Sequence, residues 1–145
     1  RFFSNTVIYD TLKQMKVEGL HLIGLNIKCY DADLRAQLSF SIFNVLNKIL
    51  SKWIPFAVGA YLLTRKDKFY EHGKFPCKYP TSEDFHLSRK YDPKKFKIAK
   101  HYFGQDSRRF KKMGYLGMSI YLIKNFLFKD NYKHWDSIDE RRYWS

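Results

Sequence analysis

The sequence predicts a mainly α-helical small membrane protein with one long transmembrane helix at about residues 33–66. Residues 38–63 are mostly apolar, and Lys48 and Lys52 are their only full charges. A helix of that length would rise about 39 Å, more than the ~30 Å hydrocarbon core of a bilayer. The 145 residues carry 27 Lys and Arg against 14 Asp and Glu, a net charge of +13, with 19% aromatic residues. This composition suits an anionic lipid surface, RNA or an acidic protein partner.

The long helix is predicted to begin after Asp33, whose carboxylate can accept hydrogen bonds from the first backbone N–H groups. Its polar residues share one side of the helix, because they recur at a spacing of four. This stripe consists of Asn44, Lys48 and Lys52, with Asn47, Ser51 and Pro55 beside it. Two interpretations stay open: a membrane helix whose stripe faces protein partners, and an amphipathic helix of a soluble bundle whose stripe faces water.

Upstream, residues 20–27 form the densest part of an apolar run that reaches Cys29. A short preceding transmembrane helix and a buried segment of a soluble protein fit this run about equally well. With the long helix it gives a predicted helical membrane hairpin at residues 1–70. The sequence begins at Arg1 without a methionine, so we expect a removed targeting peptide or a fragment of a longer chain.

Residues 71–112 are rich in Lys and Arg, contain Pro76, Pro80 and Pro93, and carry regularly spaced aromatic rings. We expect an extended basic arm anchored by these rings along another surface. A groove on a partner protein and single-stranded RNA are the alternative surfaces. Residues 113–145 are predicted to form an apolar helix, amphipathic or interfacial to the membrane, followed by an aromatic tail with Trp135, Tyr143 and Trp144.

The sequence offers little for catalysis, and we expect no independent catalytic domain and no cofactor of its own. The five histidines have no metal-ligand spacing, and no phosphate-binding or nucleophile-elbow motif occurs. The adjacent Glu83 and Asp84 suit helix capping. Cys29 and Cys77 are far apart in the sequence, which leaves one disulfide or two free thiols open.

One segment of the chain contains a set of residues at a familiar spacing: Gly59, Tyr61, Leu62, Arg65, Asp67, Tyr70, Pro80, Glu83, Asp84 and Phe85. This segment, Gly59–Phe85, resembles the C-two family of accessory subunits of NADH dehydrogenase (ubiquinone) 1, which belong to mitochondrial complex I. In that family the corresponding residues end the second membrane helix and are followed by a proline-associated acidic-phenylalanine motif. Three features depart from the family pattern: the connection between the motifs is shorter, the chain continues well beyond them, to Ser145, and Lys48 and Lys52 make the second helix more polar.

The resemblance implies a non-catalytic accessory subunit of the membrane arm of complex I in the mitochondrial inner membrane. Such a subunit packs on core and accessory membrane subunits and on the phospholipid bilayer, with a structural or assembly role and no nucleic acid. An anionic phospholipid such as cardiolipin would be held by basic side chains where a helix leaves the hydrocarbon, although simple snorkelling explains them equally. The alternatives are a subunit of another inner-membrane respiratory complex or ATP synthase, and a mitochondrial ribosomal protein that binds rRNA. The candidate head-group contacts are Lys48, Lys52, Arg65, Lys66 and Lys68.

Overall fold

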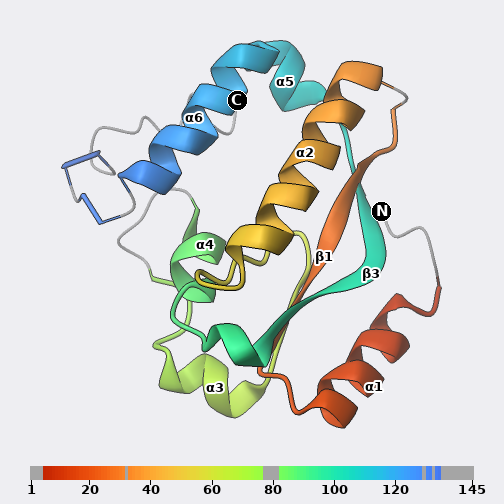
Figure 1. The fold of residues 1–145 in the computed structure, drawn as a ribbon, viewed down its shortest axis with the longest axis vertical. Coiled ribbons are helices and arrows are strands. Elements are labelled where there is room, and N and C mark those ends of the chain that lie inside the picture. Colours follow the sequence, from red (N-terminus) through yellow and green to blue (C-terminus); the bar gives the residue numbers. More distant parts are fainter. Residues whose placement is uncertain (1–4, 32, 77–81, 129, 132, 135–145) are drawn as a thin grey trace.

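The computed structural model describes residues 5–31, 33–76, 82–128, 130–131 and 133–134. Within these ranges a three-stranded sheet is surrounded by helices (Figure 1), so the fold is α/β and the predicted mainly α-helical class is wrong. The elements are α1 (Val7–Glu18), β1 (Leu22–Cys29), α2 (Leu34–Leu50), β2 (Leu62–Thr64), α3 (Lys66–Glu71), α4 (Glu83–Ser88), the 3₁₀ helix η1 (Pro93–Lys95), β3 (Phe96–Gln105), α5 (Arg108–Met113) and α6 (Tyr115–Leu127).

The long transmembrane helix expected at residues 33–66 is not formed. α2 begins after Asp33, as predicted, and ends at Leu50. The following turn tightens, with the Trp53 N–H donating to the Leu50 carbonyl at 2.9 Å. Pro55 then disfavours helical backbone in the residue before it. Among the helices of the described ranges, none combines the length and the apolar character that a bilayer crossing requires.

Two further parts of the predicted architecture are wrong. The apolar run at residues 20–29 is not a short membrane helix but strand β1, buried along its length except at Lys28. A strand covered on both faces has a continuous apolar sequence, which periodicity alone cannot distinguish from a buried helix. The predicted extended arm at residues 71–112 contains α4, η1, β3 and α5. The apolar stretch after it does contain a helix, α6, while its position at a membrane stays a prediction.

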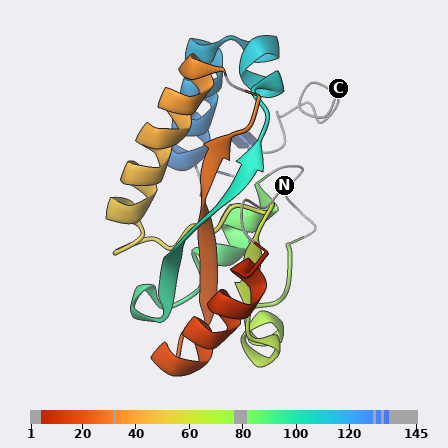
Figure 2. The ribbon, with the colours of Figure 1, turned by 90° about the vertical axis from the view of Figure 1, so that its right-hand side faces the viewer.

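The sheet has the strand order β2-β1-β3, with β1 antiparallel to β2 and parallel to β3. The β1–β3 register runs from Leu22 opposite Phe96 to Cys29 opposite Gln105, with an irregularity between Gly24 and Asn26. The buried Asn26 side chain fills that irregularity by donating to the Ala99 carbonyl at 2.8 Å. α5 and α6 lie at one end of the sheet and α1 and α3 at the other (Figures 1 and 2).

α2 completes the edge of β1 that β2 leaves open. β2 pairs only with residues 22–24 of β1, so the backbone beyond Gly24 needs other partners on that side. The Asn44 side chain supplies two of them, accepting from the Ile27 N–H at 2.9 Å and donating to the Ile27 carbonyl at 2.7 Å. The Gln37 side chain accepts from the Cys29 N–H at 2.9 Å. The polar side of α2 therefore faces the sheet of its own chain.

Candidate functional site

The side of α2 opposite Asn44 is apolar and open to solvent. Its large apolar side chains recur every three or four residues and are between 47% and 83% exposed. This orientation reverses the usual one, in which the apolar stripe of a helix faces the core. The residues are Leu34, Leu38, Ile42, Val45, Leu46 and Ile49.

α6 carries a second exposed apolar row on one helix side, made of Leu116, Ile120, Ile123 and Leu127. A cavity of about 320 Å³ lies between the two helices. Ile42 and Leu46 of α2 line it together with Ile123 of α6, so both exposed rows border the same cavity. We call the two rows and this cavity the α2–α6 surface.

The polar part of the cavity lining includes Asp84, which lies at the start of α4. Its carboxylate accepts from the Gly59 N–H at 2.6 Å and from the Phe85 N–H at 2.8 Å. A Cβ on Gly59 would lie 3.2 Å from the Asp84 carboxylate, which explains the glycine there. Part of the Asp84 side chain stays accessible to solvent, but burial among protein atoms raises its pKa, and Glu83 raises it further.

The raised pKa predicts how Asp84 affects stability. The folded state binds this proton more tightly, so the free energy of unfolding should fall as pH rises from about 4 through the raised pKa. Asp84→Asn removes the titrating group and should flatten this dependence. Urea unfolding at several pH values checks this, and Glu83→Gln, which removes the smaller raising effect on the Asp84 pKa, should weaken the dependence without abolishing it. Parallel pH profiles for wild type and Asp84→Asn would contradict the raised pKa of Asp84. Besides Asp84, the charged residues that line the cavity are Asp106 and Arg109.

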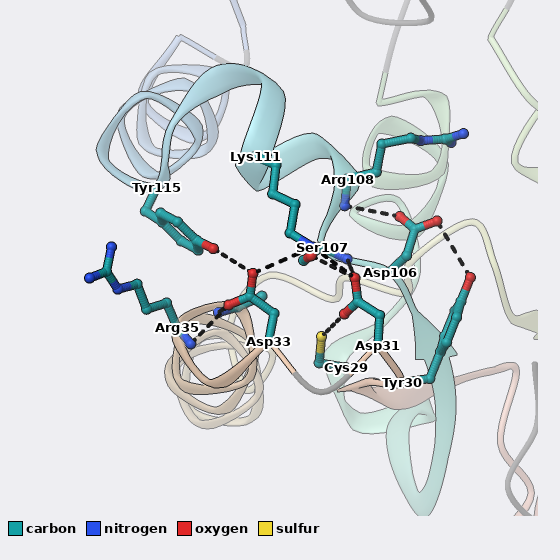
Figure 3. A network of polar contacts seen from close by, with 11 residues as sticks. Cys29, Tyr30, Asp31, Asp33, Arg35, Asp106, Ser107, Arg108, Lys111 and Tyr115 are labelled. Carbon is teal, nitrogen blue, oxygen red and sulfur yellow. Dashed lines mark hydrogen bonds and ion pairs between the residues drawn. The ribbon is translucent and has the colours of Figure 1, made fainter.

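A separate polar network joins the carboxyl ends of the parallel strands β1 and β3 (Figure 3). Asp31 accepts from the Cys29 thiol at 2.7 Å and from the Ser107 hydroxyl at 2.6 Å, which hold its pKa well below the usual range. Asp33 caps α2 and accepts from the Tyr115 hydroxyl at 2.6 Å.

Ligands of α/β proteins often bind at the carboxyl ends of strands, so the chemistry of this network matters. Burial raises the pKa of the Cys29 thiol, and the thiol donates its proton to Asp31, so it is not an activated nucleophile. Lys111 lies 3.5 Å from the Asp31 carboxylate and 3.9 Å from that of Asp33. No group of three or more potential metal-ligating side chains occurs in the described part of the chain. The contacts tie α2, α5 and α6 to the strand ends, which is a structural role.

The sequence motif residues fall into separate places. Gly59, Asp84 and Phe85 come together, whereas the Tyr61 hydroxyl bonds that of Thr11 at 2.5 Å and Arg65 pairs with Asp67 at 2.9 Å. Leu62 lies in β2, Tyr70 is exposed on α3, and Glu83 opens α4. Pro80 and Cys77 lie outside the described residues, as do Trp135, Tyr143 and Trp144.

Sequence reasoning missed the outward apolar face of α2. The pattern was present, because Leu34, Leu38, Ile42, Val45 and Ile49 follow helical spacing on the side opposite Asn44 and Asn47. It was interpreted as lipid-facing over a longer helix.

The fold and this surface define a small α/β protein with a mixed three-stranded sheet and an apolar face on two neighbouring helices. No family model, curated protein or solved structure matches the chain.

Proposed function

We propose that this chain is a non-catalytic subunit that binds a helix of a partner protein along the α2–α6 surface. The observation that carries the proposal is the outward row of six large apolar side chains on α2. Contiguous exposed apolar surface on a folded protein marks interaction sites. A hydrophobic groove flanked by helices suits an amphipathic helix that inserts apolar side chains at intervals of three and four residues.

Charge favours an acidic partner over a second copy of this chain. Cationic side chains lie on the same helices as the apolar rows: Arg35 on α2, and Lys124 on α6. A second copy of this chain would bring the same cationic side chains to the interface, and each copy has a net charge of +13, so the two copies would repel each other. A partner helix with apolar residues on one side and Asp or Glu beside them would complement both the apolar rows and the cationic side chains.

A finer form of the proposal places the partner in the membrane arm of mitochondrial complex I, at the inner membrane. Its support is the Gly59–Phe85 motif of the sequence. An inner-membrane complex supplies subunits with exposed helices on which an accessory chain packs. The docking proposal does not depend on this finer form, because it rests on the α2–α6 surface.

Site-specific photo-crosslinking tests both forms. A photoreactive residue at position 42 of the tagged full chain should form one discrete heteromeric product, whereas one at the exposed Val17 of α1 should not. We expect the crosslinked partner peptide, identified by mass spectrometry, to be an acidic amphipathic helix. A native gel stained for NADH dehydrogenase activity tests complex I. Equal labelling from both positions, a homodimer, or crosslinking to lipid alone would overturn the docking proposal.

A further inference from the structure

A second surface lies at the end of the sheet opposite α5 and α6 (Figures 1 and 2). There the Arg65 N–H donates to the His21 carbonyl at 3.1 Å, and the His21 N–H donates to the Lys95 carbonyl at 2.8 Å. Arg65, His21 and Lys95 therefore form one row across the end of the three strands. His21 and Lys95 directly precede Leu22 and Phe96, whereas Arg65 directly follows Thr64, because β2 is antiparallel to β1.

The charges of this row act on one another. The pKa of His21 is lowered, first by burial and then by the nearby cations Lys68, Arg65 and Lys95. The opposing effect of Asp67 is smaller. The end of the sheet therefore has a positive local field, despite the ion pairs that Arg65 and Lys68 form with Asp67 and Glu71.

A hollow of about 230 Å³ continues this basic end toward α2. Lys48 and Lys52 line it from the end of α2, and Lys97 lines it from β3. Lys97 pairs with Glu18 at 2.8 Å, whereas no ion pair within the described residues involves Lys48 or Lys52. Between the hollow and the strand-end row lies η1, which carries Lys94 and Lys95.

We propose that this basic end, formed by the row, η1 and the hollow, binds the phosphate backbone of a single-stranded nucleic acid. Its cations lie on α2, η1, β3 and the segment from β2 to α3, so they surround one end of the molecule. A flexible nucleic-acid strand can curve around this end, contact these cations in turn and place a phosphate in the hollow. A flat bilayer would contact only some of the cations. Lys48, Lys52 and Arg65, which are distant in sequence, all belong to this end. Lys68 lies near His21, and Lys66 is the first residue of α3.

A candidate base-stacking residue is the chain neighbour of Lys52, which lines the hollow. Trp53 follows Lys52 directly and is 67% exposed. Exposed aromatic rings among cations bind single strands by stacking on bases, with little dependence on sequence. The proposal goes beyond partner docking, because it uses none of the apolar residues of the α2–α6 surface.

The test is fluorescence anisotropy of a labelled homopolymeric RNA of about 20 nucleotides, longer than a ~4–16-nucleotide site, with the full chain over a salt series. The double variant Lys48→Glu/Lys52→Glu should bind at least about tenfold more weakly. The slope of log affinity against log salt should fall by about 1.4, or ~0.7 for each lost phosphate contact. The matched control Lys100→Glu/Lys133→Glu changes the net charge equally at exposed positions elsewhere, and its salt slope should equal that of wild type.

Trp53→Ala separates stacking from charge. It should lower RNA affinity several-fold and leave the salt slope unchanged, because stacking releases no counterions. An equal loss of RNA affinity in the test and control double variants would mean that only net charge matters and would overturn the proposal. So would the absence of RNA binding, or binding to anionic phospholipid vesicles alone. Circular dichroism should show that every variant is folded. Crosslinking from position 42 tests the α2–α6 surface, so a failure of the docking proposal can be distinguished from a failure of the RNA-binding proposal.

Discussion

The double variant Leu38→Glu/Ile49→Glu should lose its partner while keeping its fold. Both side chains are exposed, at 63% and 47%, and neither lines the cavity. Glutamate is a good helix former, so each exposed change should alter the free energy of unfolding by no more than about 0.5 kcal/mol. In the complex, however, each carboxylate would be buried against an apolar and acidic helix.

A buried charge left unpaired at an interface costs about 2–5 kcal/mol. Two such charges should weaken the association by about a thousandfold or more. The measurement is the yield of the product crosslinked from position 42, together with urea unfolding. Val17→Glu on α1, at a position 77% exposed, is the matched control and should retain wild-type crosslinking. A double variant that is folded and still forms the crosslinked product at wild-type yield would show that the partner binds elsewhere.

Asn44→Ala should destabilise the fold more than any surface substitution. The change removes both hydrogen bonds to Ile27, whose side chain is buried in the larger core cluster. Each buried backbone group left without a partner costs about 1–3 kcal/mol, so the total is about 2–6 kcal/mol. That is a large part of the ~5–15 kcal/mol that stabilises a typical domain.

Urea unfolding measures this effect, with Ser41→Ala as the control on the same helix. Ser41 is exposed and bonds only within α2, so its loss should change the free energy of unfolding little. Asn44→Asp should lie between Asn44→Ala and wild type, because a carboxylate can still accept from the Ile27 N–H but cannot donate to the carbonyl. If Asn44→Ala had the free energy of unfolding of wild type, the hydrogen bonds from Asn44 to the edge of β1 would contribute nothing to stability.

Local chemistry in the sequence predicted local structure correctly. Asp33 begins α2 by accepting from the Arg35 and Ala36 N–H groups, both at 3.1 Å, as expected of an N-cap aspartate. The end of α2 was harder to place, because apolar residues continue beyond it to Leu63. The sequence prediction places Pro55 inside the long transmembrane helix, whereas α2 has already ended at Leu50.

Contacts distant in sequence could not be read from the pattern. An apolar run of strand length becomes β1 because β3 pairs with it, and β3 comes much later in the chain, as the register of Leu22 with Phe96 shows. The approach of Gly59 to Asp84 is also long-range, and no spacing rule predicts it. The inverted orientation of α2 depends on the shortness of β2, which leaves one edge of β1 for Asn44 to fill.

The parallel pairing of β1 with β3 also has a consequence during protein synthesis. When β1 has been translated, the ribosome must still add the chain as far as Phe96 before the pairing with Leu22 can start. At about 5–20 residues per second this takes about 3–13 s. During that time the apolar strand has only β2 and α2 to cover it. We therefore expect nascent chains stalled before Gln105 to be held by chaperones rather than folded, and release from chaperones to coincide with completion of β3.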